Sequence, residues 1–190
     1  MFDSINSFEQ AKKQYYIDMV NGYGPFRFFN TLTFQYLISD DQGRKFADTY
    51  WRRTTKKLFH GKRTLPLTSI QGVAVLERAA IRKGEKGLKN CHFHFLIKDH
   101  PVFSTDESAA IAQLKDAAWK ASRNFKTVDG YTLVSAGEKG VDVGPVYNQD
   151  VAGYLFKDAA QFGWRGTDRL FYLDKHGVIA VDATPPHKMF

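Results

Sequence analysis

The chain has 190 residues, of which 43% are hydrophobic, and this content is enough to bury the core of one domain. The composition excludes a disordered chain, and no apolar run approaches the ~20 residues that a membrane-spanning helix needs. The formal net charge of +7 favours an anionic partner, either nucleic acid or a membrane surface. Cys91 is the single cysteine, which excludes an internal disulfide. Together with the lack of a secretory pattern at the N-terminus, this predicts a cytoplasmic protein.

Helical and strand-like segments alternate along the chain. Apolar spacing and turn residues predict, in chain order, helix 4–21, strand 26–38, helix 40–60, strands 68–82 and 91–98, helix 104–122, strand 131–135, helix 147–162 and a weaker hairpin at 169–173 and 177–182. This order predicts an α+β fold, with one antiparallel sheet and helices packed against it. We expect a single domain over 1–190, with a core at about 26–162, an N-terminal helix in 1–25 and a C-terminal hairpin and tail in 163–190.

The most informative segment is residues 91–97, in which two histidines alternate with apolar side chains. This period of two predicts a half-buried strand. His92 and His94 then point to one face, where both imidazoles can reach one ion, while Phe93 and Phe95 point to a core. In the alternative interpretation, one histidine belongs to a polar network and the other lies at the surface.

Glu77 is the acidic residue expected beside these histidines. In an antiparallel hairpin, the numbers of paired residues have a constant sum, so placing Glu77 opposite His92 or His94 centres the turn within residues 84–87. Two glycines lie there, which favours a tight connection and brings the paired Cβ atoms within ~4.5–5.5 Å. Two imidazoles and a carboxylate suit a divalent ion such as Mn, Mg or Zn. In the alternative, Glu77 is a solvated residue paired with a nearby arginine.

The predicted helix 147–162 carries a tyrosine and a lysine three residues apart. One face is expected to contain Tyr147, Asp150, Tyr154, Lys157 and Gln161, and the opposite, buried face Ala152, Leu155, Phe156, Ala159 and Phe162. A tyrosine hydroxyl, with a pKa of about 10, is a poor nucleophile at neutral pH, and a neighbouring ammonium favours the phenolate or protonates a leaving oxygen. In the alternative, Tyr154 and Lys157 form an ordinary surface pair.

Together these segments resemble the three motifs of HUH endonucleases, in particular the rolling-circle replication initiator (Rep) proteins with a single catalytic tyrosine. The resemblance covers about residues 26–162. It rests on the order of three sequences: Asn30-Thr31-Leu32-Thr33-Phe34, Glu77 with His92-Phe93-His94-Phe95-Leu96-Ile97, and Tyr154-Leu155-Phe156-Lys157-Asp158. It implies a central five-stranded antiparallel sheet flanked by helices, with a ferredoxin-like palm. Thr31 and Thr33 are expected to support the sheet and not the chemistry.

The resemblance also implies a reaction. His92, His94 and Glu77 would hold Mn²⁺ or Mg²⁺, Tyr154 would be the nucleophile, and Lys157 would orient a water or the phosphate. The tyrosine would nick single-stranded DNA at a replication origin, leaving a 5′-phosphotyrosine link and a free 3′-OH, and so would initiate rolling-circle replication. The implied partners are single-stranded DNA, origin hairpin DNA and, because no Walker A sequence is present, a separate host helicase. The implied compartment is a bacterial or host cytoplasm, or the nucleus for a eukaryotic virus.

Basic and aromatic residues are the candidates for DNA contact. They are Arg44, Arg52, Arg53, Lys56 and Lys57 on helix 40–60, Lys83 and Lys86 in the hairpin, and Tyr147. Tyr147 is expected to stack on DNA or to pack against the protein, and in the alternative it replaces Tyr154 as the nucleophile. Tyr50 or Trp51 would either stack on a base or lie in the core. Two other classes of function remain open from the sequence: a single-tyrosine transposase or relaxase of a mobile element, and a nucleic-acid-binding module without activity.

Overall fold

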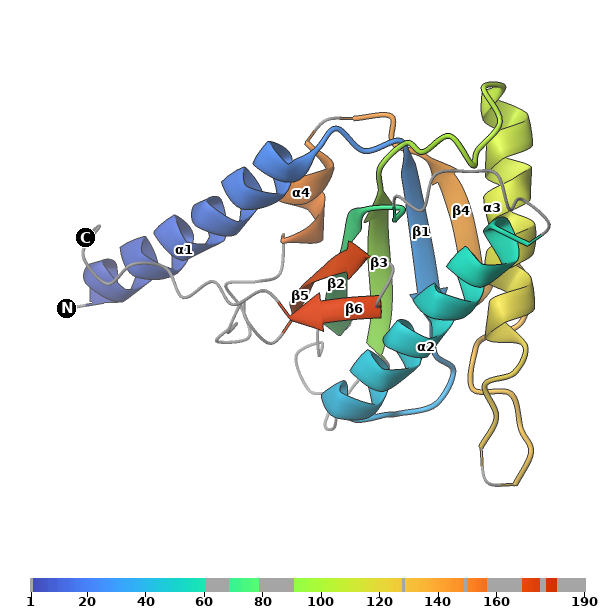
Figure 1. Ribbon diagram of the computed structural model, residues 1–190. Coiled ribbons are helices and arrows are strands. Elements are labelled where there is room, and N and C mark those ends of the chain that lie inside the picture. The colour runs from blue at the N-terminus through green and yellow to red at the C-terminus, as the bar shows by residue number, and fades with distance from the viewer. Residues whose placement is uncertain are drawn as a thin grey trace.

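The computed structural model describes residues 2–60, 69–78, 91–127, 129–148, 150–156, 169–174 and 177–180. The elements in chain order are α1 (Phe2–Tyr23), β1 (Phe28–Thr33), α2 (Asp40–Leu58), β2 (Gly72–Arg78), β3 (Cys91–Ile97), α3 (Glu107–Ser122), a short 3₁₀ helix (Gly137–Lys139), β4 (Val141–Pro145), α4 (Val151–Leu155), β5 (Leu170–Asp174) and β6 (Gly177–Ala180) (Figure 1). None of the described helices is long and apolar enough to cross a membrane.

The described strands form one antiparallel sheet in the order β4-β1-β3-β2-β5-β6. The predicted α+β fold with an antiparallel sheet and flanking helices is therefore confirmed. The sheet has six strands, so the expectation of five was wrong. One reason is that both strands of the C-terminal hairpin join the sheet, because β5 pairs with the edge of β2 that β3 leaves open.

The fourth strand lies later in the chain than predicted. Residues 131–135 make only isolated bridges, between Lys126 and Thr132 and between Phe34 and Val134. The strand that pairs with β1 is instead β4. Its sequence, VDVGP, is short and ends in glycine and proline, two residues that are depleted in strands. The sequence of β4 alone therefore gives only a weak indication of a strand.

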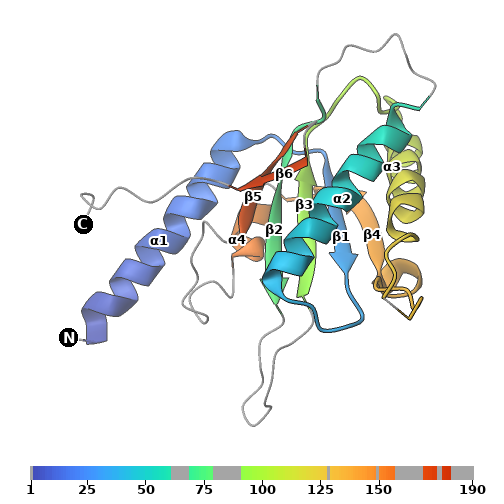
Figure 2. The ribbon, with the colours of Figure 1, turned by 60° about the horizontal axis from the view of Figure 1, so that its bottom comes forward.

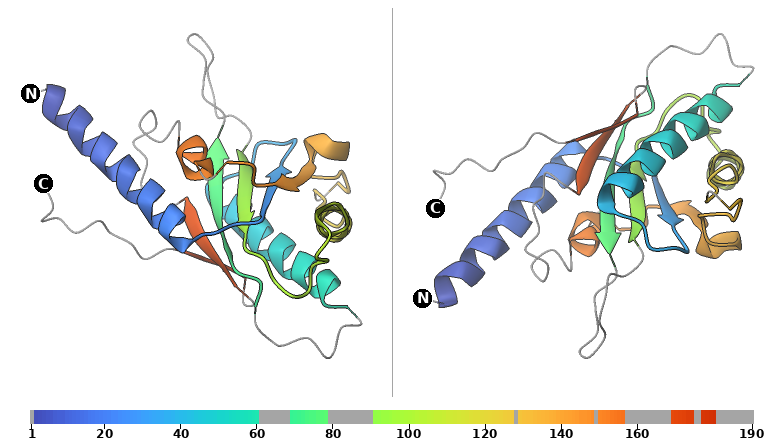
Figure 3. Two further views of the ribbon diagram at one scale, coloured as in Figure 1. Left: turned by 90° about the horizontal axis from the view of Figure 1, so that it is seen from above. Right: turned by 90° about the horizontal axis from the view of Figure 1, so that it is seen from below.

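Helices cover both faces of the sheet. Helices α2 and α3 lie side by side over one face (Figure 2), where Phe93 and Phe95 of β3 enter the larger core. Helices α1 and α4 pack on the opposite face, against Val75 and Leu96. Views from above and below place α2 and α4 on opposite faces of the sheet (Figure 3). The alternation of β3 therefore sends its phenylalanines to one layer and its histidines to the other.

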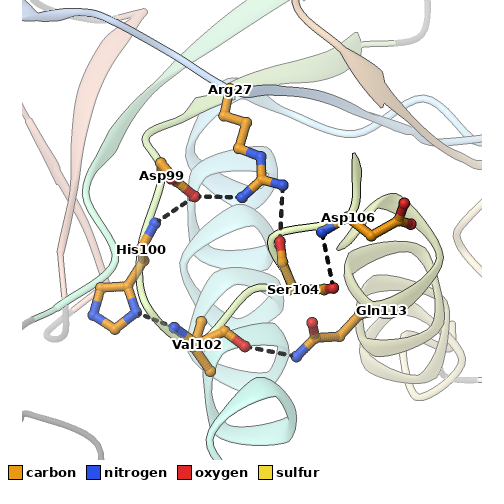
Figure 4. A network of polar contacts seen from close by, with 7 residues as sticks. All are labelled: Arg27, Asp99, His100, Val102, Ser104, Asp106 and Gln113. Carbon is orange, nitrogen blue, oxygen red and sulfur yellow. Dashed lines mark hydrogen bonds and ion pairs between the residues drawn. The ribbon is translucent and has the colours of Figure 1, made fainter. Parts of the chain in front are cut away.

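The connection from β3 to α3 is held by polar contacts (Figure 4). Arg27, just before β1, forms an ion pair with Asp99 at 2.6 Å and donates to the carbonyl of Ser104 at 2.8 Å. Further along the connection, Nδ1 of His100 accepts from the backbone N–H of Val102 at 3.0 Å. These bonds fix the path of the chain between the sheet and α3, and so the position of α3 beside α2.

Candidate metal centre

Two neighbouring strands, β2 and β3, bring the three predicted ligands together. Glu77 of β2 is the register partner of His92 on β3, which confirms one of the two registers expected from the hairpin arithmetic. The turn itself, within residues 79–90, lies outside the described residues. Because paired residues of an antiparallel sheet point to the same side, Glu77, His92 and His94 share the face that carries α1 and α4.

The three side chains converge on one carboxylate oxygen. Oε2 of Glu77 lies 3.2 Å from Nε2 of His92 and 3.0 Å from Nε2 of His94. The three ligand atoms that these residues offer all lie within 4.8 Å of one another. An ion bound ~2.0–2.2 Å from nitrogen and oxygen ligands holds those ligands about 3 Å apart, so the spacing fits a divalent ion. These three residues can therefore hold a metal ion.

The electrostatics of Glu77 favour an ionised ligand. Burial, the largest single influence, raises the pKa of its carboxyl, but the hydrogen bonds and positive charge of His92 and His94 outweigh it and hold that pKa well below its usual range. The side chain of Glu77 is 11% exposed and that of His94 is 6% exposed. At neutral pH Glu77 thus presents an ionised carboxylate in a largely buried position beside the two histidines, and the carboxylate is the form of this side chain that binds a metal ion.

Thr31 of β1 contacts the metal centre, which the sequence analysis missed. Its Oγ1 lies 3.1 Å from Nδ1 of His94, and the two residues are register partners. The contact occupies the ring nitrogen that faces away from Glu77, and it therefore orients Nε2 toward the centre. Thr31 was expected to support the sheet and not the chemistry, and its contact with a candidate metal ligand was not predicted. Local sequence patterns do not reveal that β1 pairs with β3, and without this pairing the contact of Thr31 with His94 could not be predicted.

Tyr154 of α4 lies next to the metal centre. The centroid of its ring is 6.2 Å from that of His94, at an interplanar angle of 67°. Its side chain is 52% exposed, whereas Ala152, Leu155 and Phe156 are buried. This confirms the described part of the predicted core stripe and leaves the tyrosine at the border between the sheet and solvent.

The described residues do not test the roles predicted for Tyr147 and Lys157. Helix α4 begins at Val151, so the expectation of a helix from 147 was wrong, and Tyr147 lies in the preceding coil with 91% exposure. Lys157 lies outside the described residues, as do the hairpin lysines Lys83 and Lys86. Their predicted roles stay predictions.

The basic residues of α2 lie on the other face of the sheet from the metal centre, because α2 packs against the layer of Phe93 and Phe95. Arg44 pairs with Asp41 and Arg52 with Asp48 within the helix, at 3.8 and 3.0 Å. The other three predicted DNA contacts of α2, Arg53, Lys56 and Lys57, line a groove described below. Helix α2 therefore cannot extend the surface around Tyr154.

Tyr50 and Trp51 belong to the core. Both are fully buried. The hydroxyl of Tyr50 bonds to the side chain of Asn30, and Nε1 of Trp51 donates to the carbonyl of Asp174 at 2.9 Å. Of the two possibilities that the sequence left open, base stacking is excluded for both residues.

The fold and the site define an α+β protein with an open antiparallel sheet that carries a Glu-His-His candidate metal centre beside a tyrosine. Comparison of the chain with known family models, with curated proteins and with solved structures gives no match. The function is therefore inferred from the site.

Proposed function

We propose that the protein is a metal-dependent DNA nicking and joining enzyme of the HUH type, acting as a rolling-circle replication initiator. The observation that carries the proposal is the contact between Tyr154 and His94, which joins a half-exposed tyrosine to a Glu-His-His centre. A tyrosine beside a site for a divalent cation suits a phosphodiester, because the cation offsets the negative charge that otherwise repels a phenolate. That the antiparallel sheet is the sheet of an HUH endonuclease is also part of this proposal.

The proposed reaction is a transesterification. The Oη–P bond of Tyr154 forms as the P–O3′ bond of single-stranded DNA breaks, and the phenol proton ends on the free 3′-OH. The phosphodiester bond is exchanged rather than hydrolysed, so the reverse attack by a 3′-OH rejoins the strand. Glu77, His92 and His94 would hold Mn²⁺ or Mg²⁺, which when bound supplies charge stabilisation to the phosphate. Thr31 holds the His94 ring in the orientation that this requires.

The test is a covalent-adduct assay with a pool of labelled single-stranded oligonucleotides that have a randomised centre. We expect a product that migrates with the protein on a denaturing gel, that requires Mn²⁺ or Mg²⁺, and that Tyr154→Phe abolishes. Sequencing of the linked strands gives the target sequence. A protein that forms no adduct with any member of the pool in the presence of either ion overturns the proposed function.

Matched variants separate the roles of the residues. Tyr147→Phe removes the hydroxyl of a neighbouring, fully solvated tyrosine, and we expect it to leave the adduct unchanged. His94→Ala and His92→Ala should lose both the adduct and metal binding measured by calorimetry. An adduct that survives Tyr154→Phe but not Tyr147→Phe would show that the nucleophile is assigned wrongly.

A further inference from the structure

A groove between α2 and α3 lies on the face of the sheet opposite the metal centre. It has a volume of about 640 Å³. Its α2 wall carries Arg53, Lys56 and Lys57, which follow one another at the spacing that places residues on one side of a helix within one turn. Its α3 wall carries Lys120 and Asp116. Cations therefore line both walls.

Carboxylates of the described residues leave the cations on the α2 wall unneutralised. Lys120 is paired with Asp116 at 2.7 Å. By contrast, no ion pair with a carboxylate of the described residues is made by Arg53, Lys56 or Lys57. The groove thus has an excess of positive charge that the described part of the chain leaves for a ligand.

Arg53 is the cation of the groove whose position is fixed by packing. Its Nη1 is buried, and among the described residues it has no hydrogen-bond partner. The guanidinium stacks on the ring of Phe125, with Cζ 5.2 Å from the ring centroid, so its orientation is fixed by packing. Arg53 lines the groove, so its guanidinium adds a charge in a fixed position to the excess on the α2 wall.

The walls of the groove are held in place before any ligand binds. Gln113 of α3, which lines the groove, donates to the carbonyl of Val102 at 3.0 Å (Figure 4). The ring of His100, in the same connection, packs edge-on against Phe59 at the end of α2, with centroids 5.3 Å apart. The connection between β3 and α3 therefore contacts both helices, so the cations need little reorganisation to bind.

We propose that the α2–α3 groove binds the phosphodiester backbone of a nucleic acid at a site separate from the metal centre. Because the sheet lies between the two sites, the phosphates in the groove would not be those that reach Tyr154. This second contact extends the proposed function but does not depend on it, since it is a binding site and requires no cleavage. An open groove with cations on both walls suits a continuous backbone.

The test measures binding of fluorescein-labelled DNA by anisotropy between about 50 and 200 mM NaCl. One arm uses a duplex of about 20 base pairs and the other its single strand, which distinguishes the two sources of phosphodiester. The groove variant is Lys56→Glu with Lys57→Glu, two exposed positions in the last turn of α2, and its circular dichroism spectrum is compared with that of the parent to verify folding. The control variant is Lys126→Glu with Lys139→Glu, which makes the same change of charge at exposed positions outside the groove.

We expect the groove variant to weaken binding of at least one probe by tenfold or more, and to reduce the slope of log K against log salt by up to about 2. The control variant should stay within about threefold of the parent protein. Equal losses of DNA affinity in the two variants, or no loss of affinity in the groove variant, overturn the proposal that the groove binds nucleic acid. The groove variant should keep Mn²⁺ binding, and Tyr154→Phe should keep groove-dependent binding, so failure of this site and failure of the proposed function give different results.

Discussion

Thr31→Val tests how the metal centre is organised. Valine keeps the β-branched shape of threonine on β1 and removes only the Oγ1 contact with Nδ1 of His94. Loss of a group that orients a ligating histidine typically weakens metal binding 10–100-fold. The His94 side chain is only 6% exposed and also contacts Glu77, so part of its orientation survives. We therefore expect the lower end of that range, a tenfold loss or about 1.4 kcal/mol.

The assay is calorimetric titration of the parent protein and the variant with Mn²⁺, accompanied by thermal unfolding of both without metal. Thr33→Val is the matched control, because Thr33 lies on the same face of β1 opposite His92, and among the described residues its hydroxyl makes no side-chain hydrogen bond. Affinity of Thr31→Val within twofold of the parent, or an equal loss in Thr33→Val, would refute the orienting role of Thr31.

Two further predictions concern the sheet and its larger core. In Gly72→Ala, the new Cβ would lie 2.1 Å from the carbonyl oxygen of Leu96, so we expect overpacking to cost about 1–3 kcal/mol, whereas Gly144→Ala, with open space at its Cβ, should leave Tm nearly unchanged in a calorimetric scan. Tyr50→Phe should cost about 1–3 kcal/mol in urea unfolding at pH 7, because the buried side chain of Asn30 loses its partner. Burial also raises the pKa of Tyr50 far above its ordinary value of 10.0, although the bond with Asn30 lowers it. The stability that is linked to the raised pKa of Tyr50 is fully present below pH 10.0 and is lost as the pH rises through the folded-state pKa. The fall in the free energy of unfolding at alkaline pH should therefore be shallower in Tyr50→Phe than in the parent protein. An equally steep fall in both proteins would contradict the burial argument.

Local patterns were enough to predict the centre of the site. The alternation in residues 91–97 predicted that His92 and His94 point to one face. The position of the two glycines between the strands predicted the centre of the hairpin, and so predicted that Glu77 faces the histidines. Both inferences use only neighbours in the chain or in one hairpin. They hold because a strand has a fixed period and because the numbers of paired residues in an antiparallel pair have a constant sum.

Long-range pairing was not predictable in the same way. The contact of Thr31 with His94 depends on the pairing of β1 with β3, which are joined through α2 and β2. The assignment of Trp51 to the core depends on the carbonyl of Asp174, far along the chain. Composition favours neither outcome, since an aromatic residue beside lysines occurs both in cores and on nucleic-acid-binding surfaces.

The position of β3 has a consequence for hydrogen exchange. The strand that carries both histidines is paired on each side, with β1 and with β2, along its length. Exchange of its amide protons therefore requires the sheet to separate, at a free energy close to that of global unfolding. Helix α4 is only five residues long, and we expect so short a helix to open by local fraying. Deuterium uptake should thus be slow at His92 and His94 and fast at Tyr154, so that the ligands are held rigidly while the tyrosine retains the freedom to approach and leave them.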